Sequence, residues 1–299
     1  MTSEAVRTLE PATDVSVTPD LACALLRLQH PDLADRPITL LDAGWDNVML
    51  RLGDDLALRM PCRATAASLI LNEQAWLPVL APALPLPIPT PVRVGGPALG
   101  YPYAWSVTPF IEGEPADLAP PDRHQGERLA TFLKALHRPA PDNAPLNPYR
   151  GVPLGNRAEV FEARLAVAEL ARGAMPDVRQ AWASALAAPI DTPRTWLHGD
   201  LHGRNVLTRD GRLAAVIDWG DLTAGDPACD LASVWMLLPD PAARADALAA
   251  YAPTPATIAR ARGWAALMGV TLASITNNPR MPAMGLGTIA RLAADGGAS

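Results

Sequence analysis

The chain has 299 residues, of which 49% are hydrophobic and 19% are charged, and its formal net charge is -6. This composition is ordinary for a globular protein and is sufficient for two lobes with separate cores. The negative charge argues against nucleic acid as a partner and is compatible with a cationic small molecule. The N-terminus lacks a signal-peptide pattern, and no run of eighteen apolar residues occurs. We therefore expect a cytoplasmic protein without a membrane partner, as a monomer or weak homodimer.

The first part of the chain is expected to be mainly β after a helical extension over residues 1–36. The extension contains one short helix, Leu21–Leu28. Three apolar runs separated by turn-forming residues then predict an antiparallel meander, with strands at Ile38–Leu41, Val48–Leu52 and Leu56–Met60. Apolar residues at helical spacing predict a helix over Ala64–Leu80.

Two charged residues in this region are expected to pair. Alternation along the third strand places Arg59 away from the main apolar face. Glu73 falls inside the apolar stripe of the helix over 64–80. A carboxylate in that position needs a charged, hydrogen-bonding partner, and Arg59 is the obvious candidate. The alternative is a surface arginine and a glutamate at the boundary of the core.

The segment between the helix and the second half is rich in proline. Residues Leu84–Val92 predict an extended edge rather than a central strand. A turn at Gly95-Gly96 and a strand over Tyr101–Thr108 follow. The turn composition after Pro109 suggests that an N-terminal lobe, residues 37–112, joins a C-terminal lobe, residues 113–299.

The C-terminal lobe is expected to be mainly helical. Leu129, Phe132, Leu133 and Leu136 form one apolar stripe that ends near Pro139. Further helices are predicted at Ala158–Ala171, Val178–Ala187, Ala228–Leu238, Ala242–Tyr251, Pro255–Leu267 and Gly285–Ala293.

A hairpin in this lobe carries the most informative residues. Asp210-Gly211 is a two-residue turn signal between two apolar runs. Counting back from that turn places Asn205 opposite Val216. Asp218 then shares a strand face with Val216, on a diagonal of roughly 7 to 8 Å from Asn205. Their oxygen atoms suit Mg²⁺, and Asp200 in the preceding loop could accept a proton from, or orient, a hydroxyl attacking a metal-bound phosphate.

This stretch resembles the aminoglycoside phosphotransferase family, whose members are related to choline kinases and protein kinases. The family's His-Gly-Asp followed by Asn five residues after the Asp is matched by His198, Asp200 and Asn205. Its second metal-binding Asp corresponds to Asp218, and the segment GDPACDLA, residues 225–232, resembles its next block. The resemblance implies an α+β, two-lobed protein-kinase-like fold that uses ATP and Mg²⁺ to phosphorylate an alcohol group of a small molecule.

The resemblance also implies roles for residues of the N-terminal lobe. Protein kinases grip the nucleotide phosphates with a Lys–Glu pair, and here Arg59 would replace the Lys opposite Glu73. Gly44, in the first hairpin, would let the backbone approach phosphate, although it is equally readable as an ordinary hairpin glycine. Backbone groups around Phe110, Ile111 and Glu112 would read the base.

Two other interpretations remain open at this stage. Gly199–Gly203 also fits the GDxHG opening of metallophosphoesterases, in which Asp200 and His202 would bind two metals, but the chain has few histidines to complete such a centre. The second is a catalytically silent nucleotide-binding regulator.

Three acidic residues of the C-terminal lobe are also candidates for substrate contacts. Asp221, Asp240 and Glu159 could supply negative charge to an amine-bearing substrate or could simply be solvated.

Overall fold

The computed structural model describes residues 13–44 and 46–296. The first twelve residues of the expected N-terminal extension and the last three residues of the chain lie outside this description. Contacts divide the chain into two compact units. The first comprises the chain up to Pro82 together with Ile88–Glu112, and the second comprises Ala83–Pro87 together with the chain from Gly113 onward.

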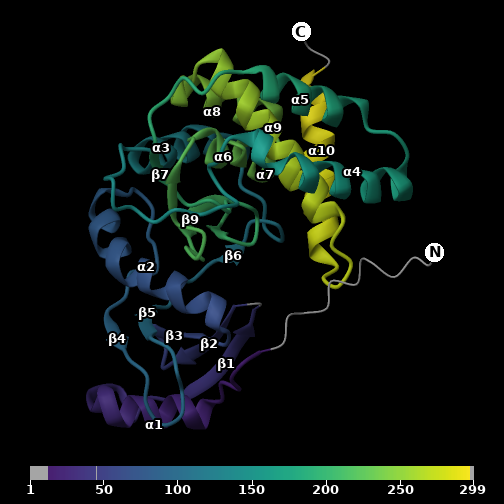
Figure 1. Cartoon of the computed structure of the whole chain (residues 1–299). Helices are drawn as coiled ribbons and strands as arrows, with labels where there is room; N and C mark the ends of the chain where they lie inside the picture. The colour runs from purple at the N-terminus through teal and green to yellow at the C-terminus, as the bar shows by residue number, and fades with distance from the viewer. Residues whose placement is uncertain (1–12, 45, 297–299) are drawn as a thin grey trace, which may run out of the picture. The chain divides into compact units, whose positions relative to one another are not determined.

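The first unit is built on a five-stranded antiparallel sheet in the order β1-β2-β3-β5-β4 (Figure 1). The strands are β1 (Ile38–Ala43), β2 (Asn47–Leu52), β3 (Leu56–Pro61), β4 (Arg93–Gly95) and β5 (Trp105–Pro109). The three-stranded meander predicted from the apolar runs is therefore confirmed.

Two helices cover this sheet. Helix α1 (Pro19–Gln29), capped by Thr18, buries Leu25 and Leu26 in the same core as Leu50 and Leu58 of the sheet. The segment expected as a separate extension thus shares the hydrophobic core of the first unit. Helix α2 (Ala64–Leu80) has the predicted bounds, and it contacts the other side of β3 through Glu73.

The edge of this sheet differs from the prediction. Gly95 was expected in a turn, but it is the last residue of β4 and pairs with Trp105. An added Cβ at Gly95 would lie 2.0 Å from the Trp105 indole, so only glycine fits beneath that ring. The strand expected from Tyr101 begins later, because Tyr101 and Ala98 form an isolated bridge around a tight turn.

The second unit is mainly helical. Its helices are α3 (Gly126–Leu136), α4 (Ala158–Arg172), α5 (Pro176–Ala187), α6 (Ala228–Leu231), α7 (Ser233–Leu237), α8 (Pro241–Tyr251), α9 (Pro255–Ala273) and α10 (Arg280–Gly296). Short 3-10 helices occur in this unit at Arg123–Gln125 and Leu154–Arg157, in the first unit at Pro31–Leu33, and across the boundary between the units at Ala81–Ala83. Helix α9 is buried along most of its length, and α5 and α10 pack along it (Figure 1).

The helices predicted for this unit are present, with three notable differences in extent. Helix α10 begins five residues before the predicted start, at Arg280, and ends three residues after the predicted end, at Gly296. The helix expected over Ala228–Leu238 is divided into α6 and α7 at Ala232. Helix α9 continues six residues beyond the predicted end, to Ala273. Within residues 13–44 and 46–296, no helix combines the length and apolar character needed to cross a membrane.

Candidate active site

The loop of residues 198–205, which carries His198, Asp200 and Asn205, lies between two small sheets of the second unit. The chain enters it from β7 (Thr195–Leu197), which pairs with β10 (Thr223–Gly225). It leaves into β8 (Val206–Arg209), which lies between β6 (Glu114–Pro115) and β9 (Arg212–Val216). Both ends of the loop are therefore fixed by strand pairing.

The predicted register of the β8–β9 hairpin is wrong by one residue. Val216 pairs with Val206, and the Ile217 N–H donates to the Asn205 carbonyl at 2.8 Å. The difference arises from an irregularity between Leu207 and Thr208 that admits one extra residue on β9. The Thr208 hydroxyl donates to the Ala119 carbonyl at 2.6 Å, a contact outside the hairpin that turn chemistry alone could not reveal.

Asp218 therefore does not reach the site by strand alternation. Strand β9 ends at Val216, and Asp218 has a positive φ of 58°. This left-handed conformation is uncommon for a residue with a side chain, although aspartate tolerates it better than most. Asp218 is exposed, and its negative charge raises the pKa of His202, so it lies within electrostatic range of the loop.

His198 anchors the loop. It is fully buried, and its Nδ1 accepts the Asp200 N–H at 3.1 Å. Since Nδ1 is an acceptor, Nε2 carries the proton and donates to the Ile217 carbonyl at 3.0 Å. One neutral imidazole thus connects the residue before Asp218 to Asp200, and a structural role accounts for this histidine.

Asp230 of α6 also anchors this loop. Its carboxylate accepts the N–H groups of His198 and Gly199 at 2.7 and 2.8 Å. Nε2 of His137 lies 3.5 Å from Oδ2 of Asp230, and Nδ1 of His137 lies 2.7 Å from the Tyr251 hydroxyl oxygen. Asp230 belongs to the segment 225–232, whose sequence pattern was noted above, but its function as an anchor could not be read from the sequence.

Gly199 is required by geometry. Its φ is +87°, and an added Cβ would lie 2.6 Å from the Asp221 carbonyl oxygen. A left-handed φ favours glycine, and the close approach excludes any side chain. The loop can therefore turn sharply only because the residue before Asp200 is glycine.

Asp200 is surrounded by donors. Its Oδ1 accepts a hydrogen bond of 2.9 Å from Nη2 of Arg150, and its Oδ2 lies 3.3 Å from Nε2 of His202. The Asn205 amide donates to both the carbonyl and Oδ2 of Asp200, at 2.9 and 3.2 Å. Asp200 and Asn205, which the sequence placed in one motif, are therefore in direct contact.

The charges around Asp200 determine its protonation. Burial alone would raise the pKa of Asp200, but the positive charges of His202 and Arg150 outweigh it and hold that pKa below its ordinary range. Burial likewise opposes protonation of His202, yet Asp200 raises the net pKa of the imidazole. Asp200 is thus an anion at neutral pH.

Arg150 also connects Asp200 to a second carboxylate. Its Nη2 lies 3.3 Å from Oδ2 of Asp221, whose Oδ1 accepts a 2.6 Å hydrogen bond from Asn147. Burial raises the pKa of Asp221, partly opposed by Arg150. Neither Arg150 nor Asn147 stands in a motif, so sequence reasoning missed both.

Asp240 and Glu159 were also considered as sources of negative charge for an amine-bearing substrate, and both lie at the N-terminal ends of helices. Asp240 caps α8, where its side chain accepts the N–H groups of Ala242 and Ala243 at 2.7 and 3.4 Å. Glu159 lies in the first turn of α4, where a negative charge is favourable.

In the first unit, the expected Arg59–Glu73 pair is present. Nη2 of Arg59 donates to Oε1 of Glu73 at 2.8 Å, and both side chains are less than 10% exposed. The alternative of a surface arginine is therefore wrong. Glu73 lies among the buried residues of α2, and the ion pair satisfies its charge there.

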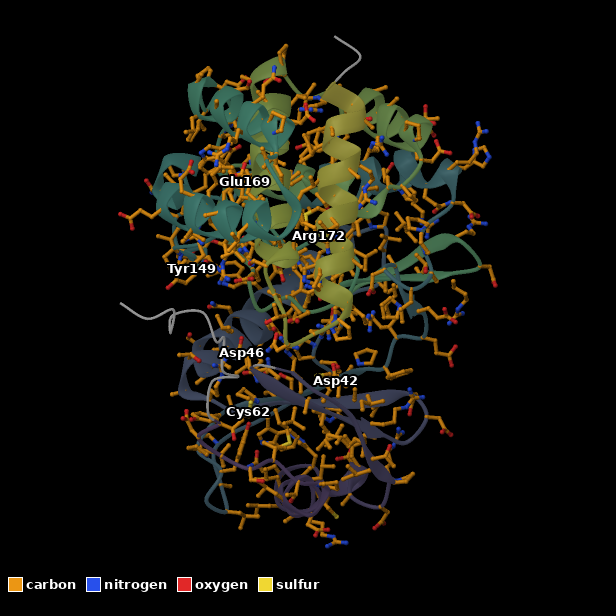
Figure 2. The ribbon with its side chains drawn as sticks, turned by 90° about the vertical axis from the view of Figure 1, so that its right-hand side faces the viewer. Asp42, Asp46, Cys62, Tyr149, Glu169 and Arg172 are labelled. Atoms are coloured by element: carbon orange, nitrogen blue, oxygen red, sulfur yellow. The ribbon has the colours of Figure 1, made fainter. Side chains whose placement is uncertain are left out.

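Gly44 closes the turn after β1. Its N–H donates to the Asn47 carbonyl at 3.0 Å, and an added Cβ would make an ordinary 3.5 Å contact with that oxygen. The turn itself thus does not require glycine. The carbonyl of Asp46, just before β2, accepts a hydrogen bond of 2.9 Å from the Cys62 N–H, just after β3. Figure 2 labels both residues.

Phe110, in the segment expected to contact the nucleotide base, already makes contacts with other residues of the first unit. The Phe110 N–H donates to the Asp55 carbonyl at 2.8 Å, and the Arg51 guanidinium lies 3.3 Å from the centre of the Phe110 ring. Ile111 is half-buried and Glu112 is exposed. The Phe110 N–H is therefore unavailable to a ligand. The backbone groups still predicted to contact the base are the Phe110 carbonyl and those of Ile111 and Glu112.

Across the described part of the chain, no group of three or more His, Cys, Asp or Glu side chains is arranged to hold a metal ion. A magnesium site does not need such a cluster, because Mg²⁺ uses one or two carboxylates together with water and phosphate oxygens.

Comparison with solved structures shows the fold. The GDP complex of aminoglycoside 2'-phosphotransferase-IIIa aligns with a TM-score of 0.67 and 17% identity, covering 94% of this chain and all of that chain. The macrolide 2'-phosphotransferase MphH from Brachybacterium faecium aligns with a TM-score of 0.57 and 23% identity, covering 89% and 97%. The expected α+β, kinase-like fold is therefore confirmed.

Two sequence comparisons agree with the family resemblance seen in the motif around Asp200 and Asn205. Viomycin phosphotransferase from Streptomyces vinaceus is 36% identical over 101 residues, which span about a third of each chain, 32% of this one and 33% of that relative. The model of the phosphotransferase enzyme family matches residues 37–265. This match covers both units and decides against the metallophosphoesterase interpretation of Gly199–Gly203. The chain belongs to the phosphotransferase enzyme family.

Proposed function

We propose that this protein transfers the γ-phosphate of ATP to a hydroxyl group of a small molecule. The observation that carries the proposal is the contact between Asn205 and Asp200, in which one amide is held against the carboxylate of the loop. Because Nδ2 makes both hydrogen bonds, Oδ1 remains as the oxygen that can face a cation. The arrangement separates a metal-binding oxygen from a hydroxyl-orienting carboxylate.

Asn205 and Asp218 would hold the magnesium ion. Both offer hard oxygen ligands, which suit Mg²⁺. The left-handed backbone at Asp218 turns its side chain out of the strand pattern, which is the kind of local strain that often accompanies function. The ion would neutralise charge on the transferred phosphate.

Asp200 would orient the acceptor hydroxyl. The hydroxyl oxygen forms a bond to the γ-phosphorus while the bond to the β,γ-bridging oxygen breaks, and ADP leaves with that oxygen. The hydroxyl proton passes to Asp200 and then to solvent. Since positive neighbours keep Asp200 ionised, it is a weak base, which fits a reaction with a loose transition state that depends mainly on alignment.

In the first unit, Arg59 would contact nucleotide phosphates, and Glu73 would fix its direction. An arginine provides a planar pair of donors where protein kinases use the single ammonium of lysine. Backbone groups of Ile111 and Glu112 would contact the base, and Gly44 would allow a phosphate to approach the first hairpin.

The structural neighbours indicate the kind of acceptor. Their descriptions include complexes with kanamycin, gentamicin and streptomycin, and a macrolide phosphotransferase. Aminoglycosides and macrolides are different classes of compound that both carry hydroxyl groups, so we propose the acceptor class as a hydroxylated small molecule.

A coupled assay of ADP release tests this proposal. Purified protein, MgATP or MgGTP, and a panel of amino sugars, macrolides, choline, amino alcohols and hydroxy acids should yield acceptor-dependent ADP and a product heavier by one phosphate. Asp200→Asn should abolish at least 99% of that turnover while still binding ATP. ATP-dependent stabilisation without product from any acceptor would instead favour the regulatory alternative.

A further inference from the structure

A cavity of about 360 Å³ lies within the second unit, next to the loop that carries Asp200. Gly203 of that loop forms part of its wall. Other walls come from the segment after β6, from α7 and from α10, through Leu118, Met236 and Met284. This volume is at the small end of the range for ligand sites, and methionine side chains adapt to irregular apolar groups.

The wall next to the loop is rigid. The Asp117 N–H donates to the Gly203 carbonyl at 3.2 Å, and an added Cβ at Gly203 would lie 2.9 Å from Asp117 atoms. Asp117 is almost fully buried and accepts two hydrogen bonds from Arg280 of α10, one of them at 2.6 Å. The charges of Asp117 and Arg280 therefore cancel each other in a bidentate pair.

Arg291 gives the cavity its net charge. Arg291 lines the cavity, and its guanidinium donates to the carbonyls of Trp235 and Met236, the latter at 3.2 Å. It forms no ion pair with any residue in 13–44 and 46–296. Burial, with Arg244 nearby, lowers the pKa of Arg291 to about 10, which still leaves it charged at neutral pH.

We propose that this cavity binds the acceptor and selects one with an apolar body and a carboxylate, which pairs with Arg291. The inference rests on the proposed phosphotransfer and specifies its substrate class. It reverses the cationic acceptor suggested by the net charge of the chain, because Arg291 is the cavity's one charge that no described carboxylate neutralises. A polycation would meet like charge there, whereas an anion would gain a charge-assisted hydrogen bond.

Matched probes test the charge preference independently of turnover. We would measure binding of 3-phenyllactate, N-acetylserine and 12-hydroxydodecanoate, each against its primary amide, by calorimetry in the presence of MgADP. At least one acid should bind tenfold or more tighter than its amide, since a charged hydrogen bond contributes about 1.5–3 kcal/mol. No binding by any acid, or equal binding of acids and amides, would overturn the proposal.

Variants of the cavity identify the residue responsible. Arg291→Met should remove the preference for the acid, and Arg291→Lys should retain part of it. Arg172→Gln, at an exposed position on α4 that does not line the cavity, is the matched control and should keep the full preference (Figure 2). If Arg291→Met is unstable, the Lys variant together with Gly287→Ala still decides, because a Cβ at Gly287 would lie 3.1 Å from Nη1 of Arg291 and should weaken acid binding severalfold.

The outcomes separate this inference from the proposed function. Selective acid binding without phosphate transfer to any acceptor would support the cavity but contradict the kinase. Transfer with equal use of acids and amides would support the kinase but overturn the selectivity. An acid preference that persists in Arg291→Met would also overturn it.

Discussion

Arg150 lies between two carboxylates, with Nη2 2.9 Å from Oδ1 of Asp200 and 3.3 Å from Oδ2 of Asp221. Arg150 itself is largely buried, and the two negative charges raise its pKa despite that burial. One guanidinium therefore fixes the direction of the proposed hydroxyl-orienting group and neutralises its neighbour.

Replacing Arg150 with methionine should reduce kcat by about tenfold to a hundredfold while leaving the KM for ATP nearly unchanged. The change removes the group that holds Asp200 and leaves two nearby carboxylates without their shared cation. Arg150→Lys should recover part of kcat, because the charge remains but the planar geometry is lost. Steady-state ADP release measures both constants, and an unchanged kcat would show that Arg150 does not position Asp200.

Asp230→Asn should lower both stability and kcat. The N–H groups of His198 and Gly199 bind different oxygens of the carboxylate, so in asparagine one of them would face an NH2 donor in place of an acceptor. Leaving a buried donor unsatisfied destabilises by about 1–3 kcal/mol. The matched control is Asp240→Asn, at a helix N-cap where asparagine serves equally well. Urea unfolding should separate the two variants, and equal midpoints would contradict the anchoring role of Asp230.

Gly199→Ala should destabilise the loop by at least about 2 kcal/mol and abolish activity, because alanine is strained at φ +87° and its Cβ would clash with the Asp221 carbonyl. Gly155→Ala is the control, since a Cβ there meets no atom within 4 Å. Thermal unfolding and ADP release would be measured for both. Full activity in Gly199→Ala would mean that the loop tolerates another backbone path.

Arg59→Met should destabilise the first unit by about 3–5 kcal/mol, because it removes the ion pair that Arg59 forms with the buried Glu73. Arg59→Lys should restore most of the stability and weaken ATP binding, since lysine offers no planar fork. Arg93→Met removes an exposed pair with Asp32 at 3.4 Å and should change stability by less than about 1 kcal/mol. Equal losses in the two methionine variants would argue against a special role for the buried pair.

The end of α10 should make a pH-dependent contribution to stability. Hydrogen bonds from Arg244 to Asp295, at 2.6 and 2.8 Å, lower the pKa of Asp295 below 3.8 against the effect of burial. This stabilisation is present above the ordinary pKa and is lost as the pH falls through the lower folded-state value. The Tm difference between wild type and Asp295→Asn should therefore be largest above about pH 5 and shrink toward pH 2. A difference that is constant with pH would contradict this.

The helices and strands that were predicted correctly are those determined by residues close together in the sequence. The apolar stripe of α2 gave both ends of the helix and the need for a partner at Glu73, and the meander followed from three apolar runs. A buried charge imposes a pairing that sequence alone can suggest. The family motif led to Asp200 and Asn205, which are in direct contact.

Features that depend on distant contacts were not predictable. The β8–β9 register includes an extra residue opposite Leu207 and Thr208, and the Thr208 hydroxyl bonds to Ala119, 89 positions away. Arg150 meets Asp200 across 50 positions and has no motif around it. Strand β4 was missed because its pairing depends on the fit of Gly95 beneath Trp105.

The most direct measurement is the Mg²⁺ dependence of ATP binding, determined by calorimetry with and without Mg²⁺ for wild type, Asp200→Asn and Asp218→Ala. The account predicts that Mg²⁺ strengthens ATP binding to the wild type and to Asp200→Asn, but has little effect on Asp218→Ala. Binding of MgATP to Asp218→Ala with wild-type affinity would contradict the assignment of the metal site.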